Sequence, residues 1–111
     1  MLIIEHRYYG YSQPFKTWDL SNLSYLTTEN ALADIALFLT SINNDLMNRY
    51  GGKKRKIFVM GGSYPGALAA WMRYKYPHIV DGALASSAVV KAIDDMWEYD
   101  RVAYDSMMLS G

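Results

Sequence analysis

The chain has 111 residues, which is enough for one small domain covering residues 1–111. Hydrophobic residues make up 51% and charged residues 20%, and the formal net charge is zero. A nucleic-acid-binding surface needs a surplus of Lys and Arg, so we expect no nucleic-acid partner. No window approaches the roughly 18 apolar residues of a membrane span. Cysteine is absent, which excludes disulfides and thiolate metal sites.

The N-terminal part of the chain is predicted to be a strand followed by a loop. Leu2 to Glu5 has the pattern of a short buried strand, and the charged residues after it end the apolar run well before the about 7–15 residues of a signal-peptide core. A domain rarely opens inside a strand, so this start suggests a truncated chain. Gly10 and Pro14 mark a loop, and residues 16–26 are predicted to be irregular. Asn22-Leu23-Ser24 matches the N-glycosylation acceptor pattern, which has meaning only in a secreted chain.

A long amphipathic helix is predicted next. Thr27 or Thr28 can cap its first turn, where the dipole favours the carboxylate of Glu29. Its apolar residues recur every three or four positions and form one stripe: Leu32, Ile35, Leu39, Ile42 and Leu46. Gly51-Gly52 ends the helix, and the basic run at residues 53–56 is predicted to be a solvated loop.

Strands and helices alternate in the rest of the chain. Residues 56–60 form a predicted strand without polar alternation, so we expect both of its faces to be covered. A helix over residues 64–76 ends at Pro77, a third strand spans residues 79–85, and residues 92–108 are predicted to be helical. The order β-α-β-α-β-α indicates an α/β fold with parallel strands. Three strands alone bury only a modest core.

The segment from Ile57 to Trp71 joins a strand to a helix through a glycine-flanked serine, which is the pattern of a nucleophile elbow. Ser63 is therefore the candidate nucleophile, and the backbone N–H of Tyr64 is the candidate oxyanion donor. The neighbouring glycines are expected to be required, because a side chain would collide with the strand or the turn. Pro65 occupies the fifth place of G-x-S-x-G and Gly66 comes one later, but proline is well tolerated at a helix start.

The elbow pattern alone leaves open a tight turn without chemistry. A nucleophilic serine needs a base, usually a histidine held by a carboxylate. His78 follows a helix of about 12 residues, which places it roughly 20 Å from Ser63. His6 ends a strand at the same edge, but it precedes the serine, so we expect it to hydrogen-bond its own loop instead. No histidine follows any candidate acid downstream of the elbow, and the aspartates there are Asp81, Asp94, Asp95, Asp100 and Asp105.

Several motifs together resemble the S28 family of serine peptidases, which includes lysosomal Pro-X carboxypeptidase, dipeptidyl peptidase II and thymus-specific serine protease. The motifs are EHRYYGYSQPF at residues 5–15, ALAD at 31–34, GGSYPGALAAW at 61–71, YPH at 76–78 and ASSA at 85–88. AIDDMWEY at residues 92–99 looks closest to the thymus-specific branch, whereas Val89 stands where the family commonly has proline. Motifs in the same order over nearly the whole chain are far more specific than the elbow alone.

The resemblance implies an α/β-hydrolase core with a helical insertion and exopeptidase cleavage of peptides near proline, either as a carboxypeptidase or as a dipeptidyl peptidase. It assigns the nucleophile to Ser63 and one oxyanion donor to the backbone N–H of Tyr64, with no cofactor and no metal. The family's catalytic acid and histidine are expected beyond Gly111. Family members enter the secretory pathway, as lysosomal or extracellular enzymes.

The resemblance further implies that one strand belongs between residues 2–5 and residues 56–60. The chain would then be a partial α/β-hydrolase core that lacks flanking strands, and it would be inactive by itself. Its exposed strand edges would also favour aggregation. Two alternatives stay open: an esterase of the α/β-hydrolase class, and a non-catalytic interaction protein. The motif at residues 5–15 argues against an esterase.

Overall fold

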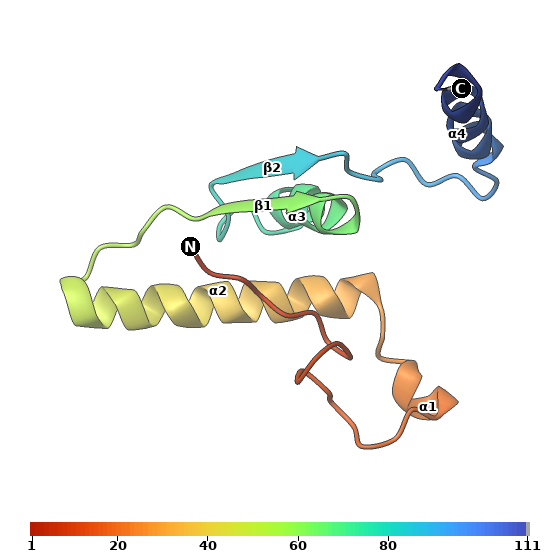
Figure 1. Ribbon diagram of the computed structural model, residues 1–111. Helices are drawn as coiled ribbons and strands as arrows, with labels where there is room; N and C mark the ends of the chain where they lie inside the picture. Colours follow the sequence, from red (N-terminus) through yellow and green to blue (C-terminus); the bar gives the residue numbers. More distant parts are fainter. Residues whose placement is uncertain (111) are drawn as a thin grey trace.

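The computed structural model describes residues 1–110, and in this part of the chain four helices accompany one two-stranded parallel sheet (Figure 1). The elements are α1 (Leu20–Leu23), α2 (Thr28–Tyr50), β1 (Phe58–Gly62), α3 (Tyr64–Lys75), β2 (Gly82–Ser86) and α4 (Trp97–Leu109). The predicted α/β class is confirmed. The predicted helices and the second and third strands are present, with shifted ends.

Helix α2 begins and ends where its capping residues predict. The Thr27 side chain accepts a hydrogen bond from the N–H of Asn30 at 3.2 Å, so Thr27 is the cap. Glu29 lies in the first turn, as predicted. Gly51 ends the helix in the left-handed conformation, with φ of 93°, which glycine adopts without the steric cost that a Cβ would add.

The sheet consists of β1 and β2, which pair in parallel with Phe58 opposite Gly82 and Gly62 opposite Ser86. Helix α3 connects the two strands and packs against both of them. The prediction that both faces of β1 are covered is wrong. Phe58 and Met60 are 72% and 68% exposed, because α3 covers one face of the strand and no other helix or strand among residues 1–110 contacts β1 on its opposite face.

A small core forms where α2 and α3 meet the sheet. Its buried members are Leu32, Ala36, Leu39, Leu68, Met72 and Val80. Two residues of the predicted stripe, Leu32 and Leu39, are buried, and Ile35 packs against the cluster. The radius of gyration is 17.9 Å, whereas a compact chain of this length has about 13 Å. Helices α1 and α4 account for part of the difference, since neither contacts another helix or strand of the described residues, and α4 stands apart in Figure 1.

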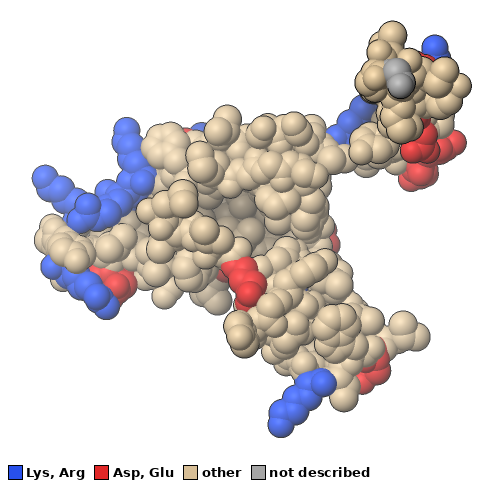
Figure 2. Space-filling model, in the orientation of Figure 1, with Lys and Arg blue, Asp and Glu red and all other residues tan. Residues whose placement is uncertain are grey.

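The N-terminal segment contains no strand. Residues 2–5 pair with no strand, so the prediction of a strand there is wrong. They run between β1 and α2 in Figure 1 and border a groove of about 1230 Å³ whose other wall is formed by β1, α2 and α3. Figure 2 shows that this face of the molecule is hollowed. A strand is held by hydrogen bonds to a neighbouring strand. The groove separates residues 2–5 from β1, so the two segments do not pair.

The segment predicted to be irregular contains the single-turn helix α1. Asp19 caps it by accepting a hydrogen bond from the N–H of Asn22 at 2.9 Å. The Nδ2 of Asn22, the atom that a glycan would modify, donates to Thr17 Oγ1 at 2.9 Å and to Asp19 Oδ2 at 3.1 Å. The acceptor pattern therefore has a structural use within this turn.

All four residues of the basic run at 53–56 are exposed, as predicted for a solvated loop. Figure 2 shows Lys and Arg side chains gathered at the end of α2 and along the segment that follows it. Lys54 Nζ donates to the carbonyl of His78 at 2.5 Å, and the Arg55 guanidinium stacks over the Tyr50 ring at 5.6 Å.

Candidate active site

The serine turn has the geometry of a strained elbow. Ser63 stands alone between β1 and α3, with φ of 59° and ψ of −125°. A positive φ is uncommon for any residue other than glycine and persists only where the surroundings enforce it. Here the Ser63 N–H donates to the Ser86 carbonyl on β2 at 3.0 Å, and the Ser63 carbonyl accepts from the Ala67 N–H at 3.0 Å. Both backbone groups of the serine are thereby held.

The hydroxyl of Ser63 does not cap the helix that follows it. A serine at a helix N-cap usually accepts a hydrogen bond from the first turn, but Ser63 makes no side-chain cap bond. The residue is exposed, and no hydrogen bond of its hydroxyl is found within residues 1–110. Tyr64 opens α3, and its N–H makes no backbone hydrogen bond to the described residues. Free N–H groups at a helix N-terminus attract negative charge.

The glycines around the turn differ in what they permit. A Cβ on Gly61 would lie 2.3 Å from the backbone carbonyl of Pro65, and one on Gly66 would lie 2.8 Å from the carbonyl oxygen of Ser86. The predicted collisions with the turn and the strand are therefore confirmed at these two positions. At Gly62 the prediction is wrong, since a Cβ there would meet nothing within 4 Å. Successive residues of a strand face opposite sides of the sheet, so a Cβ on Gly62 would lie on the side away from α3, whereas one on Gly61 would face α3.

Neither histidine is bonded to Ser63. His6 Nδ1 lies 2.8 Å from the Arg7 carbonyl, which confirms the predicted hydrogen bond to its own loop. Its Nε2 lies 3.5 Å from the Tyr64 hydroxyl. His78 follows the far end of α3, as predicted from the helix length, and its ring lies beside that of Tyr76. The described residues thus present the candidate nucleophile without a base.

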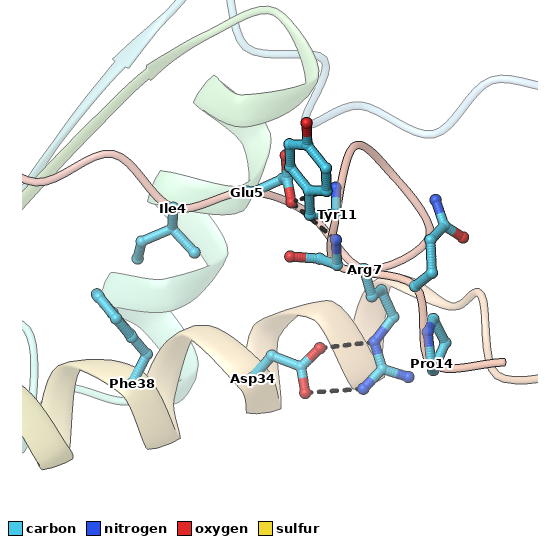
Figure 3. A pocket seen from close by; sticks show the side chains of 9 residues that line it. Ile4, Glu5, Arg7, Tyr11, Pro14, Asp34 and Phe38 are labelled. Atoms are coloured by element: carbon cyan, nitrogen blue, oxygen red, sulfur yellow. Dashed lines mark hydrogen bonds and ion pairs between the residues drawn. The ribbon is translucent and has the colours of Figure 1, made fainter.

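The loop that carries His6 is tied down by two charged side chains (Figure 3). The Glu5 carboxylate accepts the N–H groups of Ser12 at 2.8 Å and Tyr11 at 3.0 Å, and hydrogen bonding with Ser12 lowers the pKa of Glu5 below its ordinary value. The Arg7 guanidinium forms a two-pronged ion pair with Asp34 on α2, at 2.6 and 2.8 Å. This pairing raises the pKa of Arg7.

Arg7 also donates to the Tyr25 carbonyl at 2.8 Å, so one side chain joins three segments. A pocket of about 400 Å³ lies beside these contacts, lined by Glu5, Arg7, Asp34 and Phe38 among others (Figure 3). All three charged groups in that set have partners. Sequence reasoning missed the pairing of Arg7 with Asp34. Both residues lie in the family-like motifs, but only the fold shows that they meet.

Within residues 1–110, no group of three or more His, Asp or Glu side chains could hold a metal ion. None of the helices in this part of the chain has both the length and the apolar character needed to cross a bilayer.

The fold and the turn define a class: an α/β protein in which a strained, exposed serine links a parallel strand to a helix. The comparisons with known proteins name the family. The model of the serine carboxypeptidase S28 family matches residues 1–111. The chain belongs to this family, as the sequence motifs predicted.

Curated relatives agree with this assignment. Prolyl carboxy peptidase like protein 5 of Caenorhabditis elegans is 48% identical over 93 residues, covering 81% of this chain and 18% of the relative. Lysosomal Pro-X carboxypeptidase of Bos taurus is 44% identical over 99 residues, covering 86% of this chain and 19% of the relative. The human protein of the same name is 42% identical over 99 residues, covering 86% of this chain and 19% of the relative. The chain thus spans about a fifth of the length of these relatives.

Proposed function

We propose that this chain carries the nucleophile of a serine-type exopeptidase that cleaves peptides near proline. The observation that carries the proposal is the conformation of Ser63, an exposed residue held at φ of 59° between β1 and α3. Such strain is costly, of order 1–3 kcal/mol, and clusters at functional sites. A structural turn at this position would avoid the strain by using glycine. Family membership supplies the reaction class.

In the proposed reaction, the Ser63 hydroxyl attacks the carbonyl carbon of the scissile peptide bond. A base takes the hydroxyl proton as the bond forms, and the carbonyl oxygen becomes an oxyanion. The free N–H of Tyr64, at the positive end of α3, donates to that oxyanion. The amine then leaves with the proton, and water hydrolyses the acyl-enzyme. The base and its acid are supplied from outside residues 1–111, because neither histidine of the chain is bonded to Ser63.

We further propose that residues 1–111 are part of an α/β-hydrolase core. The parallel β1–α3–β2 unit with a serine elbow supports this proposal. So does the groove of about 1230 Å³ between the N-terminal segment and β1. Apolar side chains such as Ile3, Met60 and Leu68 line it, and the edge of β1 is unpaired on that side. A strand inserted there would form hydrogen bonds with the free edge of β1.

The names of the relatives support the proposed substrate and the proposed location. Two of those compared are named as lysosomal Pro-X carboxypeptidases, which points to a peptide substrate with proline near its cleaved end. Whether the released piece is a single residue or a dipeptide is a choice between two exopeptidase types. A lysosomal enzyme travels through the secretory pathway, and we propose the same route for the protein that carries this chain.

The first experiment tests the chain by itself. We expect residues 1–111 to show no serine-dependent turnover of proline-containing aminoacyl or dipeptidyl chromogenic substrates, because Ser63 has no base among the described residues. Turnover that Ser63→Ala abolishes would contradict this expectation.

The second experiment supplies the rest of the enzyme. In a chimera, residues 1–111 replace the matching segment of Bos taurus lysosomal Pro-X carboxypeptidase. We expect the chimera to cleave a prolyl peptide and Ser63→Ala to lower kcat by at least about 10³-fold. Activity that survives Ser63→Ala, or a folded chimera without activity, would overturn the proposed nucleophile. Hydrolysis of simple esters without cleavage of prolyl peptides would instead indicate an esterase.

A further inference from the structure

We infer that the Tyr64 side chain, held by His6 and Thr28, fixes the elbow on which the Tyr64 backbone N–H acts. His6 and Thr28 are then positioning residues for the reaction. The inference rests on the function proposed above, and it concerns side chains that neither the motif nor the family comparison assigns.

Three segments far apart in the sequence meet at the Tyr64 hydroxyl. It lies 3.2 Å from Thr28 Oγ1, at the first residue of α2, and 3.5 Å from Nε2 of His6, in the N-terminal loop. The His6 and Tyr64 rings are in contact, with centroids 5.9 Å apart. The His6 ring also meets the Tyr9 ring edge-on, with centroids 5.4 Å apart. The imidazole is therefore oriented by two aromatic rings as well as by hydrogen bonds.

The hydrogen bonds can be given a direction. A carbonyl oxygen only accepts, so the contact between His6 Nδ1 and the Arg7 carbonyl, at 2.8 Å, places the ring hydrogen on Nδ1. In the neutral ring Nε2 then carries the lone pair, so the Tyr64 hydroxyl donates to Nε2 and accepts from Thr28. In this tautomer the donors run from Thr28 through Tyr64 and His6 to Arg7. Arg7 is in turn paired with Asp34 on α2, so the loop and the elbow are tied to the same helix.

This arrangement bears on catalysis through the strain at Ser63. An oxyanion donor is effective only if it is aimed before the charge develops. The direction of the Tyr64 N–H depends on the backbone angles at Ser63 and Tyr64, and Ser63 occupies an unfavourable region with φ of 59°. An anchor on the very next side chain resists relaxation of that turn. Because the oxyanion exists only in the transition state and intermediate, loosening the anchor should lower kcat and leave KM nearly unchanged.

The test uses three single variants in the chimera described above: Tyr64→Phe, His6→Phe and Thr28→Val. Tyr64→Phe and Thr28→Val each remove one hydroxyl. His6→Phe removes both ring nitrogens, including the Nδ1 that bonds the Arg7 carbonyl, and all three changes keep most of the shape. We expect kcat to fall on the order of tenfold, less than the 10²–10³-fold cost of removing a donor outright. KM should change by less than about twofold. A peptide aldehyde, whose hemiacetal oxygen occupies the oxyanion position, should bind weaker by the same factor as kcat falls.

Two controls separate positioning from general stability. Tyr74→Phe makes the same change on the outer face of α3, where Tyr74 is 84% exposed, and should leave kcat unchanged. Thr28→Ser keeps the hydroxyl and should restore the kcat that Thr28→Val loses. The melting temperature of every variant is measured alongside. The double variant Thr28→Val with Tyr64→Phe should lose no more than Tyr64→Phe alone, because Thr28→Val breaks only the hydrogen bond to the Tyr64 hydroxyl, which Tyr64→Phe has already removed.

The outcomes distinguish this inference from the proposed function. If Ser63→Ala abolishes activity but the three variants behave like Tyr74→Phe, the positioning role is wrong and the nucleophile stands. Additive losses in the double variant, or losses in KM and melting temperature alone, would likewise reject positioning. Activity that persists in Ser63→Ala overturns the proposed function and this inference together.

Discussion

The packed unit of α2, β1, α3 and β2 contrasts with helix α4. In the packed unit, α3 contacts both strands and α2, and the shared core contains residues that are almost fully buried, such as Met72 at 1% exposed. Helix α4 has similar apolar residues at helical spacing, yet none of its residues is buried. Trp97 and Met107 are 53% and 65% exposed. An amphipathic sequence forms a helix in both places, but only tertiary packing converts it into stability.

The largest expected loss of stability is at Met72 in the core, and Met107 on α4 is its matched control. Met72→Ala should lower the free energy of unfolding by about 2–5 kcal/mol, because it empties the centre of the core. Met107→Ala on α4 removes the same atoms from a surface position and should cost less than about 0.5 kcal/mol. Denaturant unfolding of the 111-residue chain measures both. Equal losses at the two positions would show that α4 packs against the unit in solution.

The next effect lies within the elbow. Gly61→Ala should destabilise the chain by about 1–3 kcal/mol, because its Cβ would press against the Pro65 backbone at 2.3 Å. Gly62→Ala is the matched control, since its Cβ would meet nothing within 4 Å, and the change should stay within about 0.5 kcal/mol. Thermal unfolding of both variants tests the pair. A larger loss at Gly62 than at Gly61 would mean that the turn has a different geometry.

A smaller loss of stability is expected when the ion pair between Arg7 and Asp34 is broken, and the pair between Arg101 and Asp105 is its matched control. Asp34→Asn should cost about 1 kcal/mol, because it removes a two-pronged pair from Arg7, whose side chain is only 19% exposed. Asp105→Asn on α4 breaks a pair with Arg101 that is 3.8 Å long and exposed on both sides. Its cost should be about 0.3 kcal/mol or less. Unfolding at low and high salt measures both, and a larger salt dependence for Asp105 than for Asp34 would contradict this ranking.

The local elements of the packed unit follow from sequence, whereas the site needs three-dimensional information. Thr27, Gly51 and Pro77 mark element boundaries through backbone chemistry that acts within one turn, so α2 and α3 are predictable. The Ser63 turn is likewise local. The strand at residues 2–5 was wrongly predicted, because apolar character does not provide a pairing partner. The expected cover over β1 failed for the same reason: burial depends on neighbours.

Contacts between distant segments were not predictable at all. His6 and Tyr64 are 58 positions apart and Arg7 and Asp34 are 27 apart. No periodicity or spacing rule relates residues at such separations. Each pair becomes visible only once the loop after residue 5 is folded against α2.

The smallest expected effect is a change in the stability contributed by Glu5 as the pH falls. Hydrogen bonds with Ser12 and Tyr11 lower the pKa of Glu5 from its ordinary value of 4.5. A depressed carboxyl pKa contributes stability above the unfolded pKa, and this contribution is lost as the pH falls through the folded pKa. The stability difference between the original chain and Glu5→Gln should therefore shrink as the pH falls from about 5 to 3. The matched control is Glu98→Gln in the first turn of α4. Its difference from the original chain should change less over this interval, because no hydrogen bond of the Glu98 side chain is found within residues 1–110. A constant difference for Glu5→Gln would show that the loop does not depend on the charged carboxylate.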